Sequence, residues 1–171
     1  TSDMLTSIFL LLCSVAVFLV LLLVARNRID VVRMRKREVQ ERHDYNYAMY
    51  RTLYKKNEKL RSITLLQMAR QQIELHRPQM ALQALELVKR EKLNVAQLRS
   101  FYFYQAAAVY LDAQEGWQEA LTRCYAIPQK PQQLSQEEIE SLFLPESNPD
   151  KLVFAVSDWE EQKASLPVVT T

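Results

Sequence analysis

The chain has little of the residues that build tight loops, since its 171 residues include a single glycine. Phosphate-binding loops need several glycines, because the backbone must turn sharply and bring its N–H groups up to the phosphate. Gly116 alone therefore excludes a P-loop and a dinucleotide-binding fingerprint. Hairpin-rich β folds are disfavoured as well, because their tight turns need residues with positive φ. The abundance of Leu, Ala, Gln, Glu, Arg and Lys favours an all-α fold instead.

Residues with reactive or metal-binding side chains are also scarce. Cys13 and Cys124 are far apart in sequence, and they fit a reducing compartment better than a disulfide framework. His43 and His76 lie in no metal-binding or catalytic spacing. The sequence therefore predicts no metal, no cofactor and no catalytic residues, and we expect a protein that is not an enzyme.

Charge is absent from one long segment, residues 4–25, which is almost entirely apolar. About 20 apolar residues in a helix span the hydrocarbon core of a bilayer, at about 1.5 Å of rise per residue. A buried core helix is an alternative, but the rest of the chain is too small to surround it. A cleaved signal peptide would have a basic start and a shorter apolar core. We therefore predict a single-pass transmembrane helix over residues 4–25.

Basic residues follow the apolar segment closely, whereas no Lys or Arg precedes it. Those nearest to the segment are Arg26, Arg28, Arg33, Arg35, Lys36 and Arg37. Because cytoplasmic flanks carry the excess of basic residues, we expect the N-terminus outside and the C-terminal domain in the cytoplasm. The same six side chains are predicted to contact anionic lipid headgroups.

The segment 26–59 reads as a long basic helical stem, since residues 26–61 hold twelve basic and five acidic residues and no proline. Tyr47, Tyr50, Leu53 and Tyr54 recur at three- and four-residue steps and predict one apolar stripe. The stripe fits packing on the downstream domain, while the charges fit lipid contact. Nucleic-acid binding is disfavoured because the basic face lies against the membrane, and we expect no nucleic-acid partner. No heptad pattern in the stem lasts for three repeats, so a coiled coil has weak support.

Two similar units follow in residues 60–128. In the first unit, Pro78 is well placed to begin a second helix. In the second unit, Asn94 is a predicted N-cap and Gly116 lies in the turn between helices. The apolar positions of the first unit are Leu65, Met68, Ala69, Ala81, Leu85 and Val88, and those of the second are Phe103, Ala106, Ala107, Tyr110, Ala120 and Leu121.

These units resemble tetratricopeptide repeats, which are helix–turn–helix units of about 34 residues. The sequence Gly116-Trp117-Gln118-Glu119-Ala120-Leu121 is similar to the turn and the start of the second helix in that family. His76 stands where the family usually has glycine, and the two units are spaced more widely than the family period. The resemblance implies TPR-like helical hairpins that bind a peptide or helix of another protein. Two repeats need neighbours to cover their apolar faces, and the stem and the tail are candidates.

The segment 129–171 is acidic, with eight acidic and two basic residues after position 134. Ser135 and Glu138 have the spacing of a capping box, which predicts a short helix over residues 136–143. Residues 151–162 favour neither helix nor strand clearly, and residues 165–171 are predicted to be disordered.

The combined features predict a membrane-anchored adaptor or scaffold that binds a cytosolic protein through its helical repeats. Polar and aromatic residues on the first helix of each unit are the predicted contacts: Arg70, Gln71, Tyr102, Tyr104 and Gln105. The alternative is a structural subunit of a multi-protein membrane complex, such as a secretion or envelope-assembly machine. The expected partners are therefore membrane lipid and one or more proteins.

Overall fold

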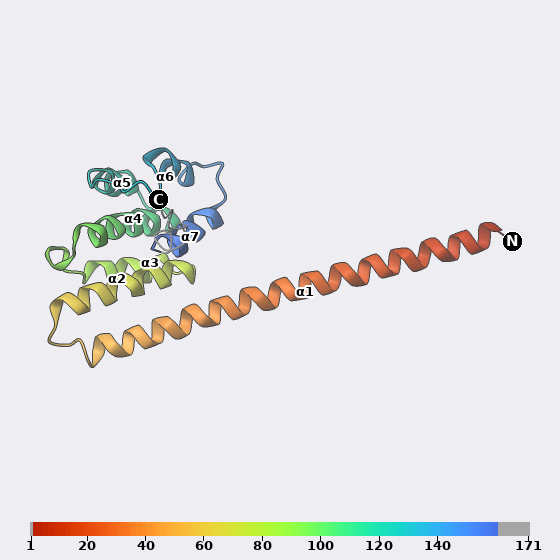
Figure 1. Cartoon of the computed structure of the whole chain (residues 1–171), viewed down its shortest axis with the longest axis horizontal. Coiled ribbons are helices and arrows are strands. Elements are labelled where there is room, and N and C mark those ends of the chain that lie inside the picture. Colours follow the sequence, from red (N-terminus) through yellow and green to blue (C-terminus); the bar gives the residue numbers. More distant parts are fainter. Residues whose placement is uncertain (1, 161–171) are drawn as a thin grey trace, which may run out of the picture. The chain divides into compact units, whose positions relative to one another are not determined.

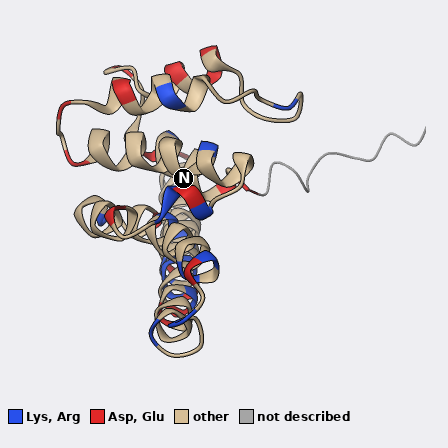
Figure 2. Cartoon of the chain, turned by 90° about the vertical axis from the view of Figure 1, so that its left-hand side faces the viewer, with Lys and Arg blue, Asp and Glu red and all other residues tan. Residues whose placement is uncertain are grey.

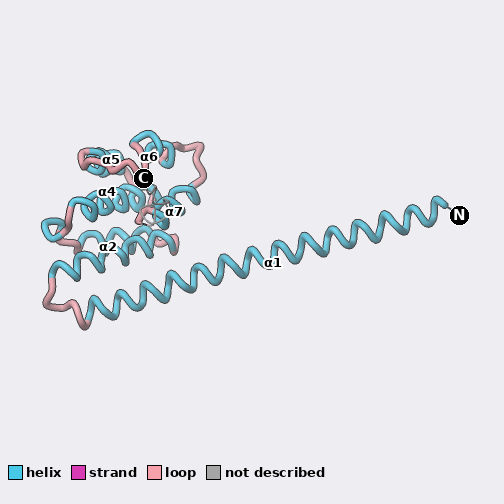
Figure 3. The backbone as a smooth tube through the Cα atoms, in the orientation of Figure 1, coloured by secondary structure: helices cyan, strands magenta, loops and turns pink. Residues whose placement is uncertain are grey.

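The computed structural model describes residues 2–160, which form seven α-helices and one short 3₁₀ helix and no strand (Figures 1 and 3). The helices are α1 (Ser2–Arg51), α2 (Glu58–Glu74), α3 (Pro78–Glu86), η1 (Arg90–Lys92), α4 (Val95–Leu111), α5 (Trp117–Tyr125), α6 (Gln136–Leu142) and α7 (Pro149–Asp158). The all-helical prediction is confirmed for the described residues. The segment 165–171, predicted to be disordered, lies outside them.

The chain divides into two compact units, Thr1–Glu38 and Val39–Thr171. The first unit consists of the larger part of α1. The second contains the last turns of α1 and all the other helices. The boundary between the two units falls within the predicted stem, residues 26–59.

Helix α1 is long because nothing in its sequence interrupts it: no glycine or proline occurs between Ser2 and Arg51. It ends at Arg51, and the turn of residues 52–57 leads to α2. Asn57 then caps α2, since its side chain accepts a hydrogen bond from the backbone N–H of Leu60. An N-cap of this kind satisfies a donor that the first helical turn cannot pair internally.

Local sequence chemistry also sets the starts of the later helices. Asn94 and Gln97 form a reciprocal capping box at the start of α4. Ser135 accepts from the backbone N–H of Glu138 at the start of α6, which confirms the predicted short helix. Pro149 occupies the first turn of α7, where its missing N–H costs nothing. Residues 151–158 are therefore helical, which resolves the ambiguity in the sequence.

Three residues in the helix connections have left-handed backbone conformations. His76 follows α2 with φ 59° and Ala113 follows α4 with φ 54°, while Gly116 precedes α5 with φ 99°. A left-handed residue after a helix lets the backbone reverse and satisfies the last carbonyl groups. Glycine adopts this conformation without strain, whereas in His76 and Ala113 the Cβ atom comes too close to the backbone and the conformation is strained.

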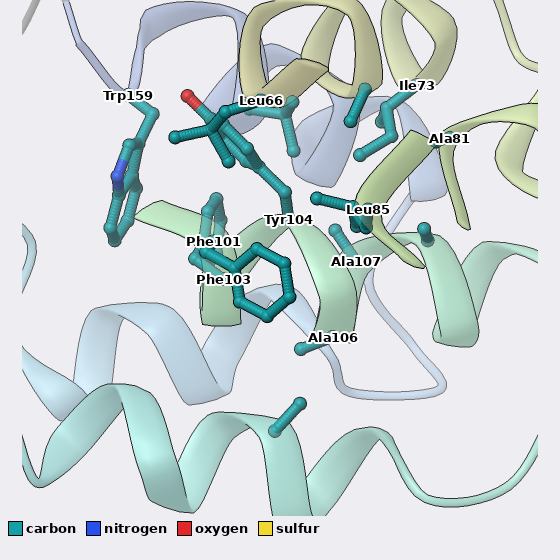
Figure 4. Close-up of a cluster of buried hydrophobic side chains, with 14 of the residues drawn as sticks. Leu66, Ile73, Ala81, Leu85, Phe101, Phe103, Tyr104, Ala106, Ala107 and Trp159 are labelled. Carbon is teal, nitrogen blue, oxygen red and sulfur yellow. The ribbon is translucent and has the colours of Figure 1, made fainter. Parts of the chain in front are cut away.

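The core of the second unit lies around α4, which buries residues on several of its faces (Figure 4). Helices α2, α3 and α5 pack around it, and consecutive helices pack on each other as hairpins do. Small residues let the backbones approach closely where the helices meet. Those fully buried are Ala69, Ala81, Ala106, Ala107 and Ala108.

Helices α6 and α7 belong to the same core, although both lie in the segment predicted as an acidic tail. Phe103 of α4 stacks on Trp159 with ring centroids 3.9 Å apart, and Phe143 meets Phe103 edge-on at 6.4 Å. Ile139 and Leu152 are fully buried. The acidic residues of α6 and α7 therefore face outward while the apolar ones complete the core.

Candidate interaction surfaces

The apolar part of α1 is exposed along its whole length. None of the side chains in residues 2–38 is buried, and this helix is long and apolar enough to cross a membrane. Its hydroxyl groups are satisfied internally, since Thr6, Ser7 and Ser14 each donate to the backbone carbonyl four residues earlier. The surface offered by this segment is therefore apolar without unpaired hydroxyl donors, as a lipid environment requires.

The six basic residues predicted to meet lipid headgroups all lie on the exposed surface of α1 in the first unit. Their side chains alternate with the exposed apolar residues Ile29, Val31, Val32 and Met34. This part of α1 is therefore both strongly basic and partly apolar.

A polar seam joins the last turns of α1 to α2 within the second unit. His43 Nε2 lies 2.8 Å from Gln72 Nε2, and Asn46 Nδ2 donates to Gln71 Oε1 at 3.1 Å. Tyr50 extends the same face of α1 and accepts from Arg61 at 2.9 Å, with the guanidinium 4.7 Å from its ring centroid. This face differs from the predicted apolar stripe, because Tyr47 and Leu53 remain exposed.

His43 is the titratable group of this seam. Burial lowers the pKa of His43 below its ordinary value, and the nearby carboxylate of Asp44 opposes that effect. The arrangement therefore favours a neutral imidazole, whose Nε2 is paired with the amide of Gln72. Arg77, from the α2–α3 turn, adds a positive charge that also lowers this pKa.

Two of the five predicted partner-binding residues are buried inside the second unit, which corrects the prediction for them. Tyr104 has no exposed surface and points from α4 toward Leu66 of α2 (Figure 4). Burial raises the pKa of Tyr104 well above its ordinary value. Gln71 is 3% exposed and is held by Asn46. Neither side chain is presented to a partner in this structure, because each fills an interhelical contact.

Arg70 is engaged within the chain as well. Its guanidinium lies 3.5 Å from the carboxylate of Glu160, which also accepts a 2.6 Å hydrogen bond from Gln67. Glu160 follows α7, so these contacts fasten the end of that helix to α2. The charge of Arg70 thus has a structural partner, and a contact with another protein would compete with it.

The two remaining predicted residues, Tyr102 and Gln105, are half-buried on α4. Gln105 lines a groove of about 370 Å³ between α3, α4 and α5. Leu82 and Val109 form apolar parts of the wall, and the exposed side chains of Arg90 and Arg123 lie along it. The groove thus combines an apolar wall with two positive charges and the single acid Glu86. Acidic and basic residues are otherwise interspersed over the helices (Figure 2).

Sequence reasoning missed Arg99 and Trp159, which lie at the centre of the second unit. Arg99 is 4% exposed, donates to the carbonyl of Leu134 at 3.2 Å and lies 4.6 Å from the ring centroid of Trp159. The indole of Trp159 donates to Ser100 at 2.9 Å. No spacing within the sequence links α4 to residue 159, so no local pattern was available to reveal this cluster.

The thiol of Cys124 is placed for packing rather than for chemistry. It is fully buried and donates to the carbonyl of Arg99 at 3.7 Å. Burial raises the pKa of Cys124 to about 11, so the thiol stays protonated at neutral pH. Among the described residues, no three His, Cys, Asp or Glu side chains gather as a metal site requires.

Comparison with known proteins adds no relative to this description. A scan against protein-family models, a search of curated proteins and a search of solved structures each found no match for this chain. The resemblance to tetratricopeptide repeats therefore stays a prediction.

Proposed function

We propose that this protein is a membrane-anchored adaptor whose helical domain binds another protein. One observation carries the proposal: the uncharged segment of α1 exposes every side chain and is followed by basic residues. Burying such a surface in lipid is strongly favourable, at about 25 cal/mol per Å² of apolar area removed from water. The basic flank supports a cytoplasmic second unit by the positive-inside rule.

The groove between α3, α4 and α5 is the proposed partner site of the helical domain. Its wall carries Leu82 and Val109, which remain half-exposed, and its charge is dominated by Arg90 and Arg123. A partner segment with apolar residues and a carboxylate satisfies both features. TPR-like hairpins are the architecture that this proposal assigns to α2–α5, and anchoring raises the local concentration of both proteins at the bilayer.

Anchoring is tested first, on the full chain in its native membranes. Alkaline extraction should leave the chain in the membrane pellet, and protease added to intact cells should spare the second unit. The mass of the mature chain should include residues 4–25, whereas a mass lacking them would identify a cleaved signal peptide. Recovery in the soluble fraction would refute the anchor.

The groove is tested with photoreactive residues placed at matched glutamines. Gln105 and Gln114 line the groove, and Gln129 is an exposed glutamine outside it. Crosslinking in cells should yield the same protein adduct from positions 105 and 114 but not from 129. An adduct from all three positions, or from none, would remove the groove from the proposal. Co-purification of the same protein in fixed stoichiometry without crosslinking would favour the structural-subunit alternative.

A further inference from the structure

A narrow stripe on α1 continues past the uncharged segment. Leu22, Ala25, Ile29, Val32 and Lys36 recur at alternating steps of three and four residues, which are the a and d positions of a heptad. All five side chains are exposed, and Ile29 and Val32 retain 53% and 52% of their surface. Lys36 contributes an aliphatic stem to the stripe. Over residues 22–36 the stripe is thus a short apolar seam with heptad spacing, and the next positions of the same register, Val39 and His43, are half-buried within the second unit.

Arginines border this seam on both sides. Arg26 and Arg33 fall at the e positions of the heptad, and Arg28 and Arg35 fall at the g positions. Side chains at e and g reach across to the neighbouring helix in a coiled coil and determine which partner is accepted. Within residues 2–160, no salt bridge joins Arg26, Arg28 or Arg33 to an acidic side chain.

The same arginines disfavour a second copy of this chain as the occupant. In a parallel pair of identical helices, a g residue faces the e residue five positions later on the other helix. Arg28 of one copy would then face Arg33 of the other, and the two Lys36 side chains would meet in the seam. Each of these contacts is repulsive, and within residues 26–38 the seam offers only Ile29 and Val32 to offset them.

Distance along the helix argues against lipid headgroups as the main occupant of the later arginines. With a rise of about 1.5 Å per residue, Arg33 lies about 12 Å and Arg37 about 18 Å beyond Ala25. The headgroup layer is only about 5–8 Å thick on each side of the hydrocarbon core, and a typical tilt of about 20° shortens these distances by only about 6%. Arg26 and Arg28 therefore reach the headgroups, whereas Arg33, Arg35, Lys36 and Arg37 extend past them.

We infer that the seam of α1 binds a helix of a partner protein that carries apolar residues on one face and Asp or Glu on both sides of that face. Carboxylates at the flanks of such a helix pair with Arg33 beyond the headgroups and with Arg28 in the outer part of the headgroup layer, while its apolar residues cover Ile29 and Val32. The distances from the bilayer rest on the proposed membrane anchor, whereas the heptad spacing and the flanking arginines do not. This surface is separate from the groove of the helical domain.

The binding test uses the full chain in nanodiscs of zwitterionic lipid and a designed helical peptide as the probe. The peptide has three heptads with Ile and Leu at a and d and Glu at every e and g position. A control peptide has Lys at those flanking positions. We expect the acidic peptide to bind at least about tenfold more tightly than the basic one, and to bind less tightly as salt is raised. Equal binding of both peptides, or of neither, overturns the inference.

Matched substitutions distinguish the seam residues from other exposed apolar residues of α1. Ile29→Asn with Val32→Asn changes the seam, whereas Val31→Asn with Met34→Asn changes apolar residues outside it that are somewhat more exposed. The seam variant should lose at least about tenfold in affinity for the acidic peptide, and the control variant less than about twofold. Because these residues lie on the exposed surface of α1, neither variant should alter folding of the second unit. Equal losses in the two variants contradict a defined seam.

Reversing the flanking charges tests the chemistry of the partner. Arg28→Glu with Arg33→Glu should shift the preference from the acidic to the basic peptide, while Arg37→Glu, on another face, should not. If these variants change only attachment to anionic vesicles, lipid is the occupant and the inference fails. If crosslinking shows a dimer of the chain that Val32→Asn abolishes, a second copy is the occupant and the inference fails as well. Failure of the anchor itself would appear separately, as loss of the unmodified chain from floated liposomes.

Discussion

The first unit and the second unit stabilise helices by opposite means. Between Ser2 and Glu38 no side chain is buried, and the helix there depends on its sequence and on whatever surrounds it. In the second unit, short helices such as α3 and α6 persist because their apolar sides enter a shared core. Isolated helices of that length are marginal in water. The comparison shows that burial within the chain maintains one unit, while the other presents its apolar surface to its environment.

The most severe test of this contrast removes the aromatic centre of the second unit. Phe103 is fully buried and stacks on Trp159. Phe103→Ala should lower the free energy of unfolding by about 3–5 kcal/mol, because it loses transfer free energy and leaves a cavity. Chemical denaturation of the full chain in detergent micelles measures this. Leu87→Ala, at a residue 61% exposed, is the control and should change it by less than about 0.5 kcal/mol.

A charge placed in the first unit should act on insertion and leave the core untouched. Val15 lies near the middle of the uncharged segment and is exposed. Val15→Arg should cost about 2.5–3.5 kcal/mol of membrane-insertion free energy, measured from the inserted fraction in microsomes. The unfolding transition of the second unit should stay the same. A large shift in that transition would show that the two units depend on each other more than the contrast allows.

Substitutions at the left-handed residues between helices should change the free energy of unfolding by less, and in opposite directions. Gly116 has φ 99° and no atom within 4 Å of an added Cβ, so Gly116→Ala tests backbone strain without a clash. It should destabilise the second unit by about 1–2 kcal/mol. Ala113→Gly, at φ 54°, should relieve strain and stabilise the unit by up to about 1 kcal/mol. Thermal unfolding of both variants compares them directly, and shifts of the same sign would contradict the argument.

Protonation of His43 should produce the smallest change, and only below neutral pH. Because the pKa of His43 is lowered in the folded state, the state in which α1 has separated from α2 binds more protons. Acid therefore favours separation of the two helices. The stability that neutral His43 contributes is fully present above its ordinary pKa of 6.5, and it is lost as the pH falls through the lowered pKa of the folded state. Unfolding measured between about pH 8 and pH 5 should show this loss, and His43→Gln should reduce it. Identical pH profiles for both proteins would exclude His43 from the seam energetics.

The seam between α1 and α2 illustrates how far sequence patterns reach. A stripe of tyrosines and leucine predicted that the stem packs on the domain, and Tyr50 does so. The docked face is otherwise polar, with His43 and Asn46 bonded to Gln72 and Gln71. Hydrophobic periodicity cannot identify such a face, because amides and an imidazole are equally compatible with solvent. The same limitation placed Tyr104 and Gln71 among the surface contacts, although both are buried.

Sequence alone determined what depends on neighbouring residues. The scarcity of glycine and the helix-forming composition specified an all-α chain, Pro78 and Asn94 marked helix starts, and residues 4–25 specified one long apolar helix. Only the tertiary structure decided which polar side chains are enclosed, because burial depends on segments far apart in the chain. Trp159 reaches Phe103 and Glu160 reaches Arg70 only after α7 returns to α2 and α4.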